Sequence, residues 1–271
     1  MVSRVLSDLT SRCRRSPGRF GIVILWIVLF LLAAGVFFYR RQIDPLPSRD
    51  SEVYIQCAGK IAAASWREVL RTDDAEVLRK PSLLLAAMAA AVRAGADAED
   101  AGVALMLLSH LLLGAALALI AEELWHDWRL SAAAFLLTAV GPLCVRFSVQ
   151  ILRDPPYWCF AAWTLWWAMR AADGKQVWRS WFCSAFCCAL AILTRREGVE
   201  LLLIFGLWIL LSGWRRREWR RILLRKVLIS VEFLAVVLLL VLPVEHRMAQ
   251  LGSQWNVGQS SAIRTYWSRL W

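Results

Sequence analysis

The chain alternates long apolar runs with short polar interruptions. A membrane-spanning helix needs about twenty apolar residues, and it must satisfy all its backbone N–H and C=O groups within itself. We therefore predict an all-α integral membrane protein with about seven transmembrane helices, at residues 20–39, 101–121, 130–150, 157–171, 179–194, 198–213 and 227–244.

The longest polar interval lies between the first two predicted spans, at residues 48–81. Inside it, the segment 52–70 has apolar residues at helical spacing, which predicts an interfacial helix lying along the membrane. These positions are Val53, Ile55, Ala58, Ile61 and Ala62. The run 81–93 predicts a half-span or surface helix opened by Pro81, because a helix start does not use the N–H that proline lacks.

Composition agrees with the membrane class. Of the 271 residues, 59% are hydrophobic and 20% are charged, and the mean hydropathy is +0.51. A soluble domain could not cover so much apolar surface. The formal net charge of +11 does not indicate nucleic acid as a partner, because the arginines cluster at the ends of apolar runs.

The positions of lysine and arginine in the short loops predict a cytoplasmic N-terminus. The strongest signal is the basic loop 214–226. The resulting organisation is a basic head at 1–19, a transmembrane module at 20–244 with an outer loop at 40–100, and a short polar outer tail at 245–271. On this topology the interval 48–81 and the two turns Arg153-Asp154-Pro155-Pro156 and Thr194-Arg195-Arg196-Glu197-Gly198 share the outer side.

Two carboxylates on that side are candidates for catalysis. Asp50 precedes the predicted surface helix, where an aspartate caps the free N–H groups. The same boundary position suits a general base, because partial desolvation makes a carboxylate a better proton acceptor. Asp154 either shapes a turn, with proline opening the next helix, or forms an ion pair with Arg153 and faces Asp50. In the second case one carboxylate binds the acceptor and the other removes its proton.

Four cations on the outer side are candidates for binding an anion: Lys80, Arg153, Arg195 and Arg196. Paired arginines in a short outer turn run against the usual inside bias, and a lipid phosphate or pyrophosphate would explain them. The alternative is snorkelling to the headgroups. Snorkelling is the interpretation that we give to Arg40, Arg41 and Arg247.

Other polar residues point to packing. His110, inside an apolar span, is interpreted as a packed residue bonded to a neighbouring helix; Glu232 is placed in the same way and stays ambiguous. The chain has seven cysteines, five of them inside predicted spans. We expect no disulfide framework, because only Cys57 is placed on the outer side. We expect no metal or redox site, because Cys183, Cys187 and Cys188 have helical spacing but no histidine or acidic partner in their run.

The order of these motifs resembles the C-type (GT-C) glycosyltransferases. A first span, then Asp50-Ser51-Glu52 with Tyr54, then Lys80-Pro81, then the Arg153-Asp154-Pro155 turn and the Thr194–Gly198 turn repeat the family's sequence of motifs. The resemblance covers about residues 20–244 and is strongest to the protein mannosyltransferase and aminoarabinose transferase branch, which includes galacturonosyltransferases of lipopolysaccharide core.

The resemblance implies inverting transfer of a sugar from a polyprenyl-phosphate sugar to an acceptor hydroxyl outside the cytoplasm. By this likeness Asp50 and Asp154 are catalytic, and Tyr54 and Glu52 position the substrate. Lys80, Arg153, Arg195 and Arg196 bind the donor phosphate. Two departures stand out: Ser51 replaces a common Glu, and the family's Leu-Thr-Lys-Gly-Pro run has become Thr194-Arg195-Arg196-Glu197-Gly198.

The likeness also implies partners and a location. The partners are membrane lipid, the lipid-linked donor, a glycan, lipid or protein acceptor and a possible membrane protein partner. Family members continue into further spans and a soluble outer domain, so we expect a minimal catalytic module, a fragment truncated at its C-terminus, or a degenerate relative that no longer turns over. The expected location is a bacterial inner membrane, with the site facing the periplasm. An endoplasmic reticulum membrane fits almost as well. The divalent-metal requirement stays open.

Two alternatives of another class use the same cations without chemistry: a polyprenyl-phosphate binding or transport protein, and a subunit of a glycan-assembly complex. Asp50 and Asp154 favour the enzyme, because carboxylates beside a phosphate would repel it in a simple binder.

Overall fold

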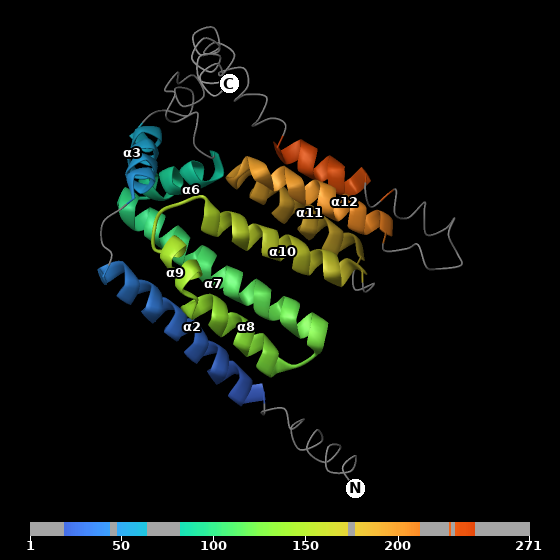
Figure 1. Cartoon of the computed structure of the whole chain (residues 1–271). Coiled ribbons are helices and arrows are strands. Elements are labelled where there is room, and N and C mark those ends of the chain that lie inside the picture. Colours follow the sequence, from blue (N-terminus) through green and yellow to red (C-terminus); the bar gives the residue numbers. More distant parts are fainter. Residues whose placement is uncertain are drawn as a thin grey trace, which may run out of the picture.

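The computed structural model describes residues 19–43, 48–63, 82–172, 177–211, 228 and 231–241. In these ranges the regular structure is helical throughout (Figure 1). The elements are α2 (Arg19–Ile43), α3 (Arg49–Ala63), α6 (Ser82–Arg93), α7 (Ala98–Trp125), α8 (Trp128–Val140), α9 (Pro142–Ser148), α10 (Asp154–Ala172), α11 (Val177–Thr194), the 3-10 helix η1 (Arg196–Gly198), α12 (Val199–Leu211) and an apolar helix at Val231–Val241.

Three of the described helices are long and apolar enough to cross a membrane. They are the Val23–Ile43 part of α2, together with α7 and α11, and the bent pair α8 and α9 raises the number to four if it forms one span. The all-α membrane class is therefore confirmed. The count of seven spans stays a prediction, because α10, α12 and Val231–Val241 do not meet the same test within the described residues.

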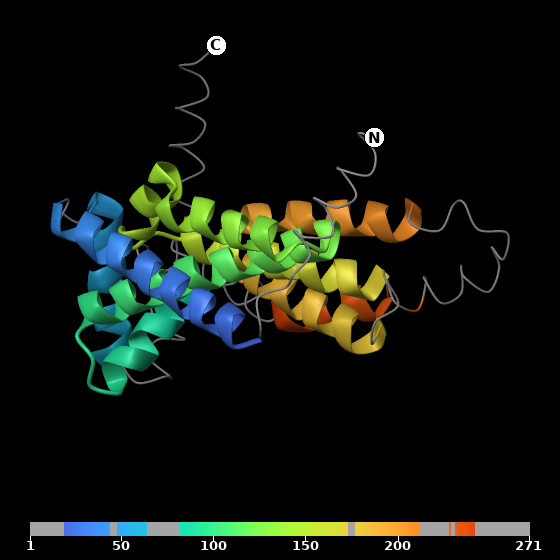
Figure 2. The ribbon, with the colours of Figure 1, turned by 90° about the horizontal axis from the view of Figure 1, so that it is seen from below.

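Helix α2 shows how such a helix divides between protein and lipid. Leu29, Ala33 and Phe37 are buried at a spacing of four residues, which places them on one face. The rest of the helix carries exposed apolar side chains such as Leu31, which is 68% exposed. An exposed apolar face of this length suits hydrocarbon. Figure 2 shows α2 lying along the outside of the other long helices.

The predicted single span at 130–150 is wrong in its shape. Two helices, α8 and α9, occupy this segment and meet at an angle of 55°. The break falls at Gly141, which has φ −58° and ψ 121° and is followed by Pro142 at the start of α9. A proline disfavours the α conformation in the residue before it and supplies no N–H to the preceding turn, so the helix cannot continue straight.

Helices α3 and α6 pack together at one end of the bundle (Figures 1 and 2). Their common core includes Tyr54, Ala58 and Met88. Arg93, at the end of α6, donates from Nη2 to the carbonyl oxygen of Ile61 at 2.8 Å and so satisfies the last turn of α3. The half-span predicted at 81–93 is α6. The helix predicted at 52–70 starts at Arg49 and is described as far as Ala63.

Helices α10 and α11 form an antiparallel hairpin. Ser184 Oγ on α11 donates to the carbonyl oxygen of Thr164 on α10 at 2.9 Å. The small residues Ala168, Ala185 and Ala189 are fully buried in the surrounding cluster, and small side chains let membrane helices approach closely. The hairpin brings the start of α10 and the end of α11 to the same end of the molecule.

His110 packs as the sequence predicts. It lies on α7 with an exposure of 1%, and its Nδ1 is 3.0 Å from the Oγ of Ser148 on α9. Ser148 is also fully buried. This hydrogen bond ties the bent pair back onto α7, and a buried polar pair of this kind is costly to break because the remaining partner has no water to replace it.

Replacing Ser148 by alanine should therefore lower stability. We expect Ser148→Ala to reduce the free energy of unfolding by about 1–3 kcal/mol, the usual effect of leaving a buried polar group unpaired. The readout is the midpoint of thermal denaturation in detergent. Ser109→Ala is the matched control, because its hydroxyl donates only to Leu105 within its own helix. An equal shift in both variants would contradict the role given to the contact between His110 and Ser148.

Candidate functional site

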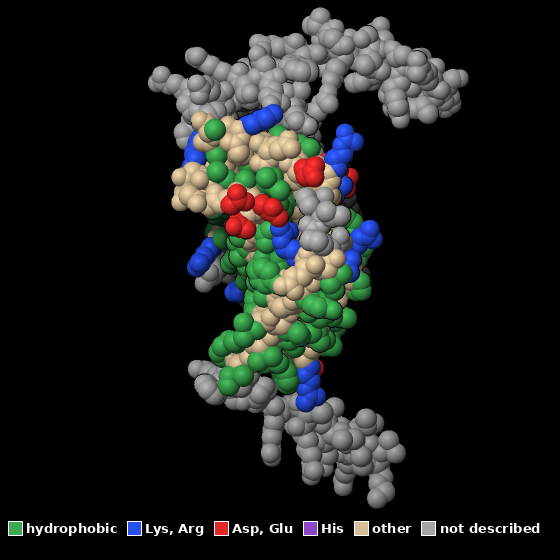
Figure 3. Space-filling model, turned by 90° about the vertical axis from the view of Figure 1, so that its left-hand side faces the viewer, with side chains coloured by type: hydrophobic (Ala, Val, Ile, Leu, Met, Phe, Trp, Pro, Cys, Tyr) green, Lys and Arg blue, Asp and Glu red, His purple; other side chains and the backbone are tan. Residues whose placement is uncertain are grey.

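The predicted site segments meet at one end of the helix bundle. Three contacts join elements far apart in sequence there: Arg41 with Glu99, Ser51 with Ile151, and Asp154 with Arg195. Figure 3 shows Asp and Glu side chains gathered near this end with Lys and Arg beside them, above a mainly hydrophobic surface. The start of α3 and the two polar turns are thus on the same side, as the sequence indicates.

A cluster of four charged side chains joins the two polar turns. Asp154 Oδ1 pairs with Arg195 Nη1, Arg195 Nε lies 3.2 Å from Glu197 Oε2, and Arg153 Nη2 lies 4.0 Å from Glu197 Oε1. The predicted ion pair between Arg153 and its neighbour Asp154 is wrong, because each residue pairs with the other turn. The cluster therefore fixes the start of α10 against the end of α11.

The local sequence explains why the turns lie where they do. Asp154 begins α10, where a negative charge is favourable beside free N–H groups, and two prolines follow in the first turn. Gly198 ends η1, and a Cβ there would lie 2.9 Å from the Cα and N of Ile192. A side chain would push η1 off the backbone of α11, so glycine allows the close approach that holds Glu197 beside Arg195.

The charges of the cluster reinforce one another. Glu197 has a lowered pKa, first because of the hydrogen bond from its own backbone N–H and then because of Arg195 and Arg153. Burial of Arg195 would lower its pKa, but the carboxylates of Glu197 and Asp154 outweigh this effect and raise it above the ordinary value. The guanidinium carbon also lies 5.8 Å from the ring centroid of Tyr157, within range of a cation–π contact.

The first turn of α3 carries Asp50. Ser48 caps this helix, because its Oγ accepts a hydrogen bond from the N–H of Ser51 at 3.2 Å. The interpretation of Asp50 as the cap is therefore wrong. Asp50 lies in the first turn with an exposed side chain, and Glu52 is also exposed.

Tyr54 connects this turn electrostatically to the RDPP turn. Its side chain is buried, and burial raises its pKa to about 12. Arg153 lowers that pKa, whereas Asp50 and Asp154 raise it, so the phenol lies within the field of all three charges. Tyr54 is a neutral phenol at physiological pH and can donate a hydrogen bond.

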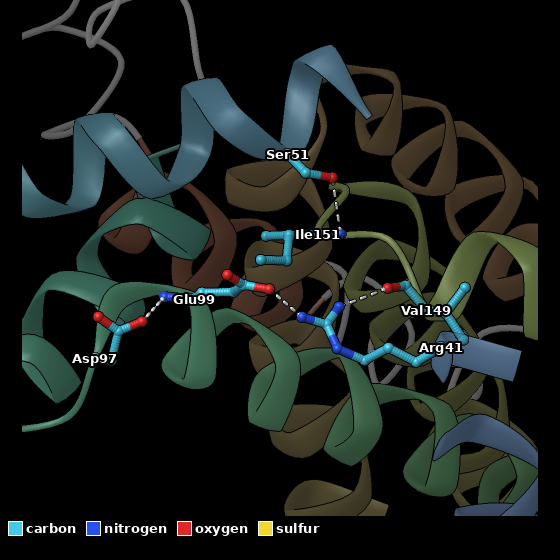
Figure 4. A network of polar contacts seen from close by, with 6 residues as sticks. All are labelled: Arg41, Ser51, Asp97, Glu99, Val149 and Ile151. Carbon is cyan, nitrogen blue, oxygen red and sulfur yellow. Dashed lines mark hydrogen bonds and ion pairs between the residues drawn. The ribbon is translucent and has the colours of Figure 1, made fainter. Parts of the chain in front are cut away.

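Ser51 joins α3 to the RDPP turn directly (Figure 4). Its Oγ accepts a hydrogen bond from the N–H of Ile151 at 3.1 Å, and Ser51 is only 1% exposed. The hydroxyl also lies 2.9 Å from the Oγ of Ser48. Because Ser51 is next to Asp50 and Ile151 is close in sequence to Arg153 and Asp154, this bond sets how the two candidate carboxylates lie relative to each other.

Arg41 supports the same loop from the other side. Its Nη2 pairs with Glu99 on α7, and its Nη1 donates to the carbonyl oxygen of Val149 at 3.3 Å (Figure 4). Asp97 caps α7 just before Glu99. The snorkelling predicted for Arg41 is therefore wrong: its guanidinium is bound within the protein. Arg247 lies outside the described residues.

The structure places some of the predicted site residues and leaves others open. It brings Arg153, Asp154 and Arg195 together, and it places Asp50, Glu52 and Tyr54 on the neighbouring helix. Lys80 lies outside the described residues. Arg196 belongs to η1, and its side chain is not described.

Sequence reasoning missed Glu197, Ser51 and the pair of Arg41 and Glu99. Glu197 belongs to the Thr194–Gly198 turn, and an acidic residue directly after two arginines could have been predicted to form an ion pair with one of them. Ser51 stood at a position where the family commonly has Glu, so its substitution was visible but its bond to Ile151 was not. Nothing in the sequence links Arg41 with Glu99, which are separated by 58 positions.

Among the described residues, no group of three or more His, Cys, Asp or Glu side chains could hold a metal ion. The described cysteines carry free thiols. The described residues at this end of the bundle supply carboxylates, a phenol and guanidinium groups. Such a set can accept a proton and bind an anion.

A family model described as dolichyl-phosphate-mannose-protein mannosyltransferase matches residues 80–245, more than half of the chain. The match begins at Lys80 and contains both polar turns, whereas Asp50, Glu52 and Tyr54 precede it. No curated protein and no solved structure matches the chain.

Removing the Ser51 hydroxyl should loosen α3 from the RDPP turn. Ser51→Ala leaves the buried N–H of Ile151 without its acceptor, at a cost of about 1–3 kcal/mol. We therefore expect faster hydrogen exchange in peptides covering residues 149–153, measured by mass spectrometry in detergent. Glu52→Gln, an exposed neighbour on the same helix, is the control and should leave the exchange unchanged. Wild-type exchange in Ser51→Ala would show that this bond does not hold α3.

Proposed function

Since the chain belongs to the dolichyl-phosphate-mannose-protein mannosyltransferase family of membrane glycosyltransferases, we propose that it moves a sugar from a polyprenyl-phosphate sugar to an acceptor hydroxyl on the non-cytoplasmic face. The observation that supports this most directly is the meeting of Arg153, Asp154 and Arg195 beside the helix that carries Asp50. The acceptor is a glycan, a lipid or a protein at the membrane surface.

In the proposed reaction, Asp50 accepts the proton of the acceptor hydroxyl. The hydroxyl oxygen forms a new bond to the anomeric carbon as the bond from that carbon to the phosphate oxygen breaks. Attack from the face opposite the phosphate inverts the configuration. The exposed position of Asp50 in the first turn of α3 supports this role, because an acceptor can reach the carboxylate from the aqueous side.

The leaving phosphate carries away the bonding electrons and needs positive charge. We assign this task to Arg153 and Arg195 of the described site, together with Lys80 and Arg196. Guanidinium groups bind phosphate through charge-assisted hydrogen bonds, and fixed donors aimed at developing charge are an effective means of catalysis. The chemistry as proposed needs no nucleotide, because the donor is already activated by its phosphate.

Asp154 and Tyr54 complete the proposed site. Asp154 is the second catalytic carboxylate and orients the acceptor, while its ion pair with Arg195 also fixes that guanidinium. Tyr54 keeps its proton at working pH and positions the substrate as a hydrogen-bond donor. Glu52, exposed beside Asp50, contributes on the acceptor side.

Replacing the base tests the reaction. We expect Asp50→Asn to lower kcat by about 100- to 10,000-fold, the range typical for a general base, while the affinity for polyprenyl phosphate stays near the wild-type value. The measurement is transfer from radiolabelled polyprenyl-phosphate sugars to a membrane-extract acceptor. Lys80→Ala is the contrasting variant and should weaken donor binding.

A binding protein or an assembly subunit would give a different result. Wild-type protein would then bind polyprenyl phosphate through Lys80, transfer no sugar, and be indifferent to Asp50→Asn. That outcome would contradict the enzymatic proposal and favour the non-catalytic alternative.

We also propose that the site faces the periplasm of a bacterial inner membrane. The support is the charge bias of the loops, with the basic segment 214–226 on the opposite side. We expect alkaline phosphatase fused after Gly95 to be active and the same enzyme fused after Asp127 to be inactive, with the reverse pattern for green fluorescent protein. Active phosphatase at Asp127 would place the site in the cytoplasm.

A further inference from the structure

One carboxylate lies between the two guanidiniums assigned to the donor phosphate. Glu197 approaches Arg195 Nε with Oε2 at 3.2 Å and Arg153 Nη2 with Oε1 at 4.0 Å. A phosphate group between two arginines would present its oxygens in the same manner. Glu197 thus occupies the place that an anionic ligand of Arg153 and Arg195 would take.

The two carboxylates of the cluster differ in how firmly they are held. The side chains of Asp154 and Arg195 are 23% and 28% exposed, whereas those of Glu197 and Arg153 are 47% and 42% exposed. Exposed ion pairs contribute little to stability, because water and salt compete with them. Asp154 is therefore the more firmly held partner of Arg195, and Glu197 is the carboxylate that another anion can replace.

The contact of Glu197 with Arg195 is also incomplete. Arg195 Nε is buried, and no described residue accepts a hydrogen bond from it, although Glu197 Oε2 is only 3.2 Å away. A buried donor that lacks an acceptor is unfavourable. An oxygen placed in line with this N–H would bind better than the carboxylate does.

From this geometry we propose that Glu197 is an exchangeable stand-in for the donor phosphate: together with Asp154 it offsets the charge of Arg153 and Arg195 in the resting protein, and it moves aside when the phosphate of the lipid-linked sugar binds. This inference rests on the proposed function, because it concerns the same phosphate. Glu197 is ionised at neutral pH, since its pKa is lowered, and so it competes with a full negative charge.

The exchange has a consequence for turnover. The donor carries a phosphodiester with one negative charge, whereas the released polyprenyl phosphate is a monoester with about 1.5 to 2 negative charges at pH 7. Without Glu197, Arg153 and Arg195 would hold that product strongly, even with Asp154 still paired to Arg195. Glu197 returning to the guanidiniums displaces the product phosphate, so the carboxylate weakens binding of both donor and product and favours release.

The test compares binding of undecaprenyl phosphate to the full chain in phosphatidylcholine nanodiscs. We expect Glu197→Gln to bind it roughly three- to tenfold more tightly than wild type, because the substitution removes a competing charge while keeping the shape. Glu200→Gln is the matched control: it makes the same change in net charge three residues later, at an exposed position, and should stay within about twofold of wild type.

The outcomes separate the two proposals. If wild type binds undecaprenyl phosphate and Glu197→Gln binds it equally or more weakly, the stand-in is overturned while the proposed function remains. An equal increase in affinity in Glu200→Gln would also overturn the role given to Glu197, because the increase would then follow from the change in net charge. If neither wild type nor Glu197→Gln binds undecaprenyl phosphate, the proposed function fails with it.

Further arms identify the source of the phosphate. Inorganic phosphate and nanodiscs containing phosphatidylglycerol are titrated against the same variants. A gain in Glu197→Gln confined to undecaprenyl phosphate supports the donor lipid as the ligand. The same gain for phosphatidylglycerol or inorganic phosphate would overturn that assignment, because the arginines would then take any phosphate.

Discussion

A helix that crosses a bilayer can present charged side chains at its ends without exposing them to hydrocarbon, and this constraint determines where chemistry can take place in this protein. The described ion pairs of the candidate site lie at helix ends: Arg41 at the end of α2, Glu99 at the start of α7, Asp154 at the start of α10 and Arg195 after α11. The site is an assembly of helix termini, and its geometry depends on how the helices align.

That alignment is set by packing well away from the charges. The close contact of α10 and α11 over small buried residues fixes the distance between their ends, and the glycine at the end of η1 lets the polar turn fold back onto α11. Only then can Asp154 reach Arg195. The hydrogen bond from the N–H of Ile151, which follows α9, to Ser51 Oγ in turn fixes α3 relative to α9. Packing in the bundle and this buried hydrogen bond together determine the arrangement of the polar groups at its end.

Much of the fold could be predicted from the sequence. Apolar runs of about twenty residues indicate spanning helices, and α2, α7 and α11 fall where hydropathy places them. Gly141-Pro142 is a sequence signal for the bend between α8 and α9. The bend was not predicted, because the apolar run around it is long enough for one straight span. The orientation inferred from arginine placement, which relies on the cost of moving charge across a bilayer, stays a prediction.

The site was harder to predict than the fold. The residues in motifs could be singled out one by one, but their pairing could not: Asp154 was expected to pair with its neighbour Arg153 and instead pairs with Arg195 across the hairpin. Asp154 and Arg195 are 41 positions apart in sequence. They meet because of the lengths and the relative register of α10 and α11, and a local sequence pattern predicts neither quantity. The same limit applies to Ser51, whose acceptor role depends on where the bent pair ends.

The departure of the Thr194–Gly198 turn from the family pattern now has a physical interpretation. The family commonly carries one lysine in this turn, whereas this chain carries Arg195, Arg196 and Glu197. An added arginine in this turn raises the local positive charge, and a guanidinium binds phosphate more firmly than an ammonium because it offers paired donors. Glu197 offsets that added charge at the same turn. On the proposed function the two changes belong together, because a turn that binds the donor phosphate more strongly would also hold the product phosphate more strongly unless a carboxylate such as Glu197 competes with it.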